Sequence, residues 1–195
     1  MTHDQSWLLI SVSTAGGPGT LRVQVWRKLR SLGALYLQQS VCLLPDRSET
    51  IRQVRRLMDR VHQQGGNGRV LRITLADQAE YTQIVSEFNA ARDAEYAEVL
   101  ERLPAFREEL DRERDRGRTT YAEVEESEAD LERFRSWLAK IAARDYFHAP
   151  AGPAARTAVE HAAADLAAFE QTALSAETAA MSTGPGIPAL HGEAQ

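Results

Sequence analysis

Four arginines lie close together in the sequence and could bind an anion. They are Arg52, Arg55, Arg56 and Arg60. Segment 46–64 is predicted to be a helix because its apolar residues recur every three or four positions, so the four side chains lie within about 2.5 turns. The planar fork of an arginine matches phosphate oxygens. The cluster therefore fits a partner that carries phosphates, although it could equally pair with acidic residues in the second half of the chain.

Charge is divided unevenly along the chain. The whole sequence has a formal net charge of −5 at pH 7. Residues 1–75 contain 11 Lys and Arg against 4 Asp and Glu, a net charge of +7, whereas the remaining residues contain 12 against 24, a net charge of −12. Because the cations of the first part gather on predicted helices, we favour an anionic partner, either nucleic acid or a small oxyanion. The alternative is that the two parts neutralise each other.

Acid–base or metal chemistry would have to come from a polar group around residue 148. Here Asp145, Tyr146 and His148 could act as base, proton donor and metal ligand. In the enzyme alternative, a metal or haem is held by His148, in a pocket between the two parts of the chain. Its lining residues would be His148, Tyr146, Tyr96 and Arg92. Residues of this composition at a helix end more often pack and cap, and Arg92 with Glu95 is explained as a pair on one helix face. We therefore favour a protein that is not an enzyme and expect no cofactor.

Composition excludes several other classes of protein. The single cysteine, Cys42, rules out an internal disulfide framework and a metal site made of cysteines alone, and its apolar surroundings predict an inert core residue. No apolar run is long enough to span a bilayer. Residues 1–13 lack the basic region and long apolar core of a secretory signal. We expect a cytoplasmic protein with no membrane partner.

The elements that position the cations are predicted within residues 7–75. Apolar and β-rich runs predict strands, and three- and four-residue apolar spacing predicts helices. The expected order is strand 7–12, helix 21–32, strands 34–37 and 41–44, helix 46–64 and strand 69–75. The order βαββαβ is that of a ferredoxin-like unit, whose sheet would bury one face on the two helices. The Gly-rich segment 13–20 lacks P-loop spacing, so we expect a tight connection rather than an anion cradle.

From residue 79 onward the pattern is helical. Pro104 is predicted to end one helix and start another turn or helix. The carboxylates of 123–130 lack EF-hand spacing and are expected to form a solvated acidic face. The predicted fold class is α+β, with a ferredoxin-like unit at 1–78, a mostly helical region packed on it at 79–178 and a disordered tail at 179–195.

Four segments carry a resemblance to a known family. They are WRKLRSLGALYLQQSVCLLP at 26–45, EFNAARDAEYAE at 87–98, the acidic-then-apolar stretch 121–141, and ARDYFHAP at 143–150. Their order resembles the N-terminal domain of the chromate-resistance protein ChrB, a family whose members usually carry a second, C-terminal domain. The hairpin segment GALYLQQSVCLLP is more weakly similar to PaaX-type repressors. Ser40 stands where the family usually has Gly in the hairpin turn.

The resemblance implies a regulator of chromate-responsive genes that binds promoter DNA. By that resemblance the basic residues of the first helix would be among the DNA or oxyanion contacts, namely Arg22, Arg27, Lys28 and Arg30. The leading hypothesis is thus a cytoplasmic DNA-binding regulatory or stress-response protein. A small metal- or haem-dependent enzyme remains the alternative, and a third interpretation is an interaction module that forms a homodimer through its sheet.

Overall fold

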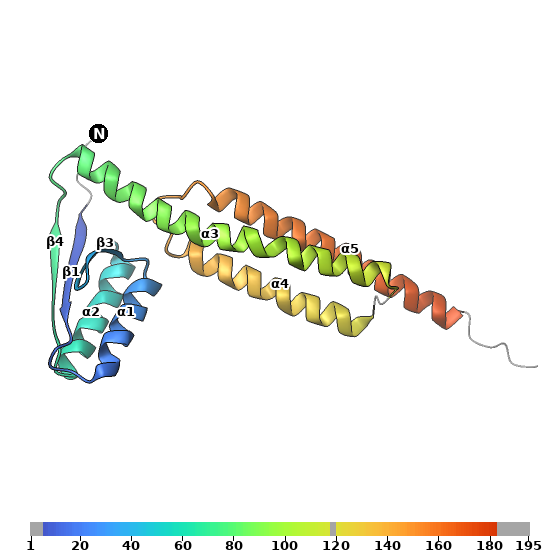
Figure 1. Cartoon of the computed structure of the whole chain (residues 1–195), viewed down its shortest axis with the longest axis horizontal. Coiled ribbons are helices and arrows are strands. Elements are labelled where there is room, and N and C mark those ends of the chain that lie inside the picture. The colour runs from blue at the N-terminus through green and yellow to red at the C-terminus, as the bar shows by residue number, and fades with distance from the viewer. Residues whose placement is uncertain (1–5, 118–119, 183–195) are drawn as a thin grey trace, which may run out of the picture. The chain divides into compact units, whose positions relative to one another are not determined.

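The computed structural model describes residues 6–117 and 120–182, which form four strands and five helices (Figure 1). Their order is β1 (Trp7–Ser13), α1 (Gly19–Ser31), β2 (Leu35–Gln38), β3 (Val41–Pro45), α2 (Ser48–Gln63), β4 (Asn67–Ile73), α3 (Gln78–Asp115), α4 (Tyr121–Ala142) and α5 (Gly152–Ser182). The chain divides into two compact units. Among the described residues, the first comprises 6–97 and 138–153, and the second comprises 98–117, 120–137 and 154–182.

The four strands of the first unit form one antiparallel sheet in the order β2-β3-β1-β4. The central strand β1 pairs Leu8 with Leu44 of β3 on one side and with Arg72 of β4 on the other. The register between β2 and β3 shifts between Tyr36 and Gln38. An α+β protein with an antiparallel sheet and a mostly helical remainder is therefore confirmed.

Alternate residues of β1 supply the cores on the two faces of the sheet. Leu8, Ile10 and Val12 point to the face covered by α1 and α2, where the predicted apolar stripes of both helices are buried. The buried members of these stripes are Leu21, Val25, Leu29 and Leu32 on one helix, and Val54, Leu57 and Val61 on the other. Because strand side chains alternate with period two, Trp7 lies on the opposite face.

The opposite face is covered by aromatic residues from distant parts of the first unit. The ring centroid of Trp7 lies 5.8 Å from that of Phe88 on α3 and 5.6 Å from that of Phe147, which follows α4. Phe88 and Phe147 are 5.4 Å apart. The prediction that the sheet buries a single face was therefore incomplete, since the second face also carries a core.

Glycines end both basic helices. Gly33 has φ +73°, and its N–H bonds to the carbonyl of Arg30 while the next N–H, of Ala34, bonds to Leu29. This pair of hydrogen bonds is a Schellman motif, which requires a left-handed residue past the helix end. Gly65 ends α2 in the same way, with φ +81°.

The Gly-rich turn before α1 is a close backbone contact. A Cβ atom at Gly16 would clash with the carbonyl oxygen of Gly65, and one at Gly17 would lie 2.9 Å from the carbonyl oxygen of Gln64. The two glycines thus allow the turn to approach the end of α2. The predicted tight connection accounts for them without an anion.

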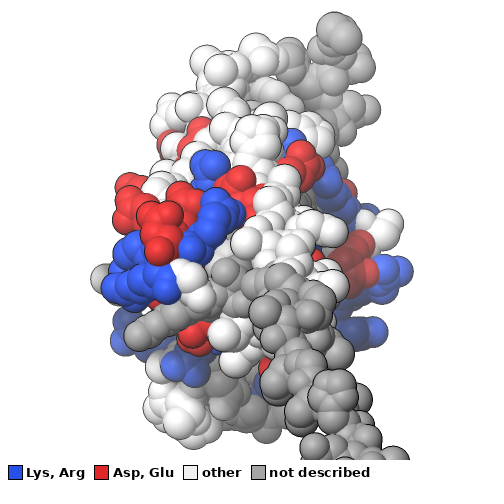
Figure 2. All heavy atoms as spheres, turned by 90° about the vertical axis from the view of Figure 1, so that its right-hand side faces the viewer, with Lys and Arg blue, Asp and Glu red and all other residues white. Residues whose placement is uncertain are grey.

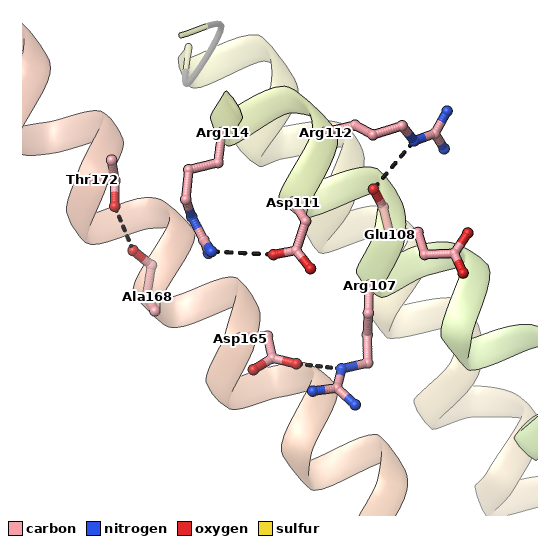
Figure 3. Close-up of polar contacts among 8 residues, drawn as sticks. All are labelled: Arg107, Glu108, Asp111, Arg112, Arg114, Asp165, Ala168 and Thr172. Carbon is pink, nitrogen blue, oxygen red and sulfur yellow. Dashed lines mark hydrogen bonds and ion pairs between the residues drawn. The ribbon is translucent and has the colours of Figure 1, made fainter. Parts of the chain in front are cut away.

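The second unit packs α4 and α5 along the later part of α3. Phe106 and Phe134 lie 6.0 Å apart at their ring centroids, and Arg107 Nε donates to Asp165 Oδ2 at 2.5 Å (Figure 3). Pro104 lies inside α3, so the prediction that the helix is interrupted there was wrong. Buried Leu103 and Phe106 flank this proline, and their packing offsets the backbone hydrogen bond that proline cannot donate.

Two further features concern the ends of elements. Strand β4 begins and ends two residues earlier than predicted, and α5 continues to Ser182, so residues 179–182 of the predicted disordered tail are helical. Residues 183–195 of the predicted tail lie outside the described residues. No helix in the described part of the chain is long and apolar enough to cross a membrane.

Candidate functional site

The basic residues predicted as anion contacts lie on two neighbouring helices. Helices α1 and α2 lie side by side on one face of the sheet (Figure 1), and Lys28 Nζ of α1 donates a hydrogen bond to Gln53 Oε1 of α2. Lys28 is half-buried by this contact, and the other seven predicted contacts are exposed. They are Arg22, Arg27 and Arg30 on α1 and Arg52, Arg55, Arg56 and Arg60 on α2.

Most of these guanidinium groups have no hydrogen-bond or ion-pair partner among the residues that the structure describes. Arg27, Arg55, Arg56 and Arg60 form no hydrogen bond or ion pair with any residue in 6–117 or 120–182. Arg52 differs because it pairs with Glu49, one helical turn earlier, and this hydrogen bond is the main cause of a lowered pKa of the Glu49 carboxyl. Arg30 lies over the ring of Trp26, with Cζ 5.1 Å from the ring centroid. Unpaired arginines on adjacent helices can donate hydrogen bonds to several anionic oxygens at once.

A second group of polar side chains is gathered at the end of α1. Arg92 Nη2 donates to Glu95 Oε1 at 3.1 Å, and Arg144 donates to Glu95 Oε2 at 2.9–3.0 Å. Arg92 is only 7% exposed, and its Nε and Nη1 atoms have no hydrogen-bond partner among the described residues. Burial lowers the pKa of Arg92, against the opposing attraction of Glu95. One carboxylate thus serves two cations, which makes the group a buried ion-pair network rather than a surface pair.

The two tyrosines named for the enzyme alternative form hydrogen bonds that stabilise this part of the fold. Tyr96, which is fully buried, donates its hydroxyl to Asp145 Oδ2 at 3.1 Å, while Asp145 Oδ1 accepts the N–H of Ala149 at 3.0 Å. Tyr146 donates its hydroxyl to the carbonyl of Leu32 at 2.7 Å. These bonds hold segment 143–151 in place, which is a structural role.

His148 stands apart from these contacts. It is exposed, with φ +60°, a left-handed conformation that is uncommon for residues other than glycine. Within the described ranges, no group of three or more His, Cys, Asp or Glu side chains is arranged to hold a metal ion. The structure therefore brings Arg92, Tyr96 and Tyr146 into one neighbourhood but supplies no ligand set around His148.

The surface of the second unit has a different charge pattern. Several of its arginines pair with carboxylates one turn away on their own helix, as Arg114 does with Asp111 at 3.1 Å and Arg133 with Asp130 at 2.5 Å. On the face drawn in Figure 2, acidic and basic side chains lie next to one another. Such pairing leaves little net field for an anion, so the basic helices of the first unit are the better candidate site.

Sequence reasoning missed two participants in these clusters. Arg144 was not singled out, because its partner Glu95 lies 49 positions away. Trp26 was read only as part of a family segment, although it is 46% exposed. A large aromatic residue among four cations of one amphipathic helix is a signal that could have marked it.

Comparison with known proteins gives one match. A family model described as "Protein ChrB, N-terminal" matches residues 22–180, which include all the basic residues named above on α1 and α2 and the ion-pair network around Glu95. No curated protein and no solved structure matches the chain.

Proposed function

The chain belongs to the ChrB N-terminal family, and we propose that it is a cytoplasmic DNA-binding regulator of a chromate-resistance response. The observation that carries the proposal is the set of exposed, unpaired arginines on α1 and α2. Arginine is well suited to phosphate contacts because its planar fork donates two parallel hydrogen bonds. The two helices are joined by the Lys28–Gln53 hydrogen bond and share one core, so their exposed arginines can contact successive phosphates of one nucleic-acid backbone.

The fold gives this surface a rigid base. The βαββαβ order with strand order β4-β1-β3-β2 supports a ferredoxin-like unit, in which both helices rest on the sheet. Their inner faces are buried in one core, so their outer faces keep a constant spacing. In this proposal Arg27, Arg55, Arg56 and Arg60 bind phosphates, while Arg52 first has to leave Glu49.

The test is retention of duplex DNA by purified, nucleic-acid-free protein as a function of salt. We expect affinity to fall steeply between about 50 and 200 mM salt, since each phosphate contact adds roughly 0.9 to the slope of log affinity against log salt. Replacing Arg56 by Gln should reduce the magnitude of that slope by roughly 0.9, the contribution of one phosphate contact. The double variant Arg55→Glu/Arg56→Glu should abolish retention.

The matched control is Arg133→Glu/Arg135→Glu on α4. It makes the same change in net charge at exposed arginines that already pair with carboxylates of their own helix, and it should retain DNA like the wild type. If folded Arg55→Glu/Arg56→Glu protein retards DNA unchanged, the proposal fails. The visible absorption spectrum of the same sample tests the enzyme alternative, because a metal- or haem-derived band would favour it.

A further inference from the structure

An open cavity of about 760 Å³ lies beside α1 in the first unit. Its walls come from the end of β1 and the turn after it, from one flank of α1, and from the hairpin of β2 and β3. Sites for small organic molecules typically have volumes of about 300–1,000 Å³. The cavity is therefore large enough for a ligand of two fused rings, and it lies between α1, the end of β1 and the β2–β3 hairpin.

The walls of the cavity are mostly apolar. Val25 and Leu29 of α1 form part of them, together with the ring of Trp26 and the half-buried ring of Tyr36. Cys42 also contributes, and because burial raises the pKa of its thiol to about 12 it is neutral near pH 7 and is no nucleophile. Aromatic side chains at an open surface offer flat faces for a ring of the ligand.

The polar part of the lining is one-sided in charge. Arg22 is the single charged residue among the lining residues, and no acidic side chain accompanies it. Arg22 is exposed and has no hydrogen bond or ion pair to any residue that the structure describes. The lining residues also include Ser13, Thr14 and Ser40, whose side chains can supply hydroxyl donors. A lone guanidinium with hydroxyl donors fits a carboxylate or a similar anionic group.

We propose that this cavity binds an aromatic organic acid, with its anionic group at Arg22 and its ring against Trp26 and Tyr36. A small inorganic oxyanion could use Arg22 but would leave the apolar walls in contact with water. An uncharged aromatic ligand would leave Arg22 without a partner. The proposal goes beyond DNA binding and stands whether or not the protein binds DNA, because the ligand is measured directly.

The experiment is calorimetric titration of the full chain with naphthalene-2-carboxylate and with its uncharged analogue naphthalene-2-carboxamide. The carboxylate should bind about tenfold or more tightly than the carboxamide, as expected for one charge-assisted hydrogen bond. Arg22→Gln should lower the affinity for the carboxylate to that for the carboxamide. Arg133→Gln, at an exposed arginine of α4 that does not line the cavity, should leave both affinities unchanged.

A second variant tests the position of the ring. Trp26→Ala should weaken the binding of both compounds, because it removes an apolar wall without changing the charge. Two results would overturn the proposal: full affinity in folded Arg22→Gln protein, or no binding of the carboxylate. If sulfate or chromate still bound at Arg22 in the second case, the cavity would be an oxyanion site only.

Discussion

The hydroxyl of Tyr146 donates a 2.7 Å hydrogen bond to the main-chain carbonyl of Leu32, which lies 114 positions earlier in the sequence. Leu32 caps the C-terminal end of α1. The guanidinium of Arg47 lies over the ring of Tyr146 at 4.9 Å, and its Nη2 donates to the carbonyl of the same residue at 2.7 Å. The segment after α4 therefore holds the end of the first basic helix and the start of the second.

Replacing Tyr146 by Phe should destabilise the first unit. The change removes only the hydroxyl, and the buried Leu32 carbonyl then lacks its donor, for an expected loss of about 1–3 kcal/mol in free energy of unfolding. Urea denaturation measures this loss. Tyr121→Phe is the control, because Tyr121 is 51% exposed and its substitution should change stability by no more than about 0.5 kcal/mol. Equal stability of the two variants would show that the Tyr146 bond contributes nothing.

Gly33→Ala should be more costly than an ordinary glycine substitution. Gly33 has φ +73°, and a Cβ there would lie 2.6 Å from Arg92 Nη1 and 2.9 Å from Arg144 Cβ. A left-handed alanine costs about 1–2 kcal/mol, and overpacking adds about 1–3 kcal/mol. Gly117 has φ +63° with no atom within 4 Å of its added Cβ, so Gly117→Ala should show the backbone cost alone. Chemical denaturation measures the free energy of unfolding of both variants, and an equal loss in the two would contradict the prediction.

Removal of the Glu95 carboxylate should strongly destabilise the fold. Glu95 pairs with Arg92 and Arg144, and Arg92 is only 7% exposed. In Glu95→Ala a buried cation is left without its counter-ion, a change that typically costs about 3–5 kcal/mol. Thermal and urea unfolding would both report it.

The control for Glu95 is Glu132→Ala. The Glu132 side chain is 70% exposed and lies 3.9 Å from Arg135, and such surface pairs contribute about 0–1 kcal/mol. A loss in Glu95→Ala no larger than in Glu132→Ala would mean that the network around Arg92 relaxes without its carboxylate.

Cys42 should resist thiol reagents and weaken the fold at high pH. Burial raises the pKa of its thiol from 9.0 to about 12, so native protein near pH 8 should react only after denaturant is added. Between pH 9 and 12 the unfolded chain loses this proton while the folded chain keeps it. Stability is therefore fully present below pH 9 and falls as pH rises through this window.

The variant that isolates this effect is Cys42→Val, which has a similar volume and no proton to lose. Its free energy of unfolding should fall less steeply between pH 9 and 12 than that of the wild type. Tyr36 remains in both proteins, and its pKa is raised to about 12 by burial and also by the Cys42 thiolate, so Cys42→Val reduces the slope that Tyr36 adds as well. Identical slopes, or rapid labelling of Cys42 in native protein, would contradict the prediction.

Local sequence patterns determined most of the secondary structure and the core between the sheet and helices α1 and α2. The apolar spacing of Leu21, Val25, Leu29 and Leu32 predicted the buried face of α1, because residues three or four apart share one side of a helix. The order of four sequence segments between residues 26 and 150 indicated the family. Pro104 shows the limit of such signals, since packing around Leu103 and Phe106 overrides a local preference against helix.

Tertiary structure alone decided which distant side chains meet. Glu95 joins Arg144, Trp7 stacks on Phe147, and Trp26 shares a cavity with Tyr36, yet no spacing in the sequence marks any of these pairs. Helical and strand periodicity show which face of an element is buried, but not which other element covers it. Pairing, cavity shape and the unpaired state of the basic arginines depend on the packing of whole elements, which forms only when the chain folds.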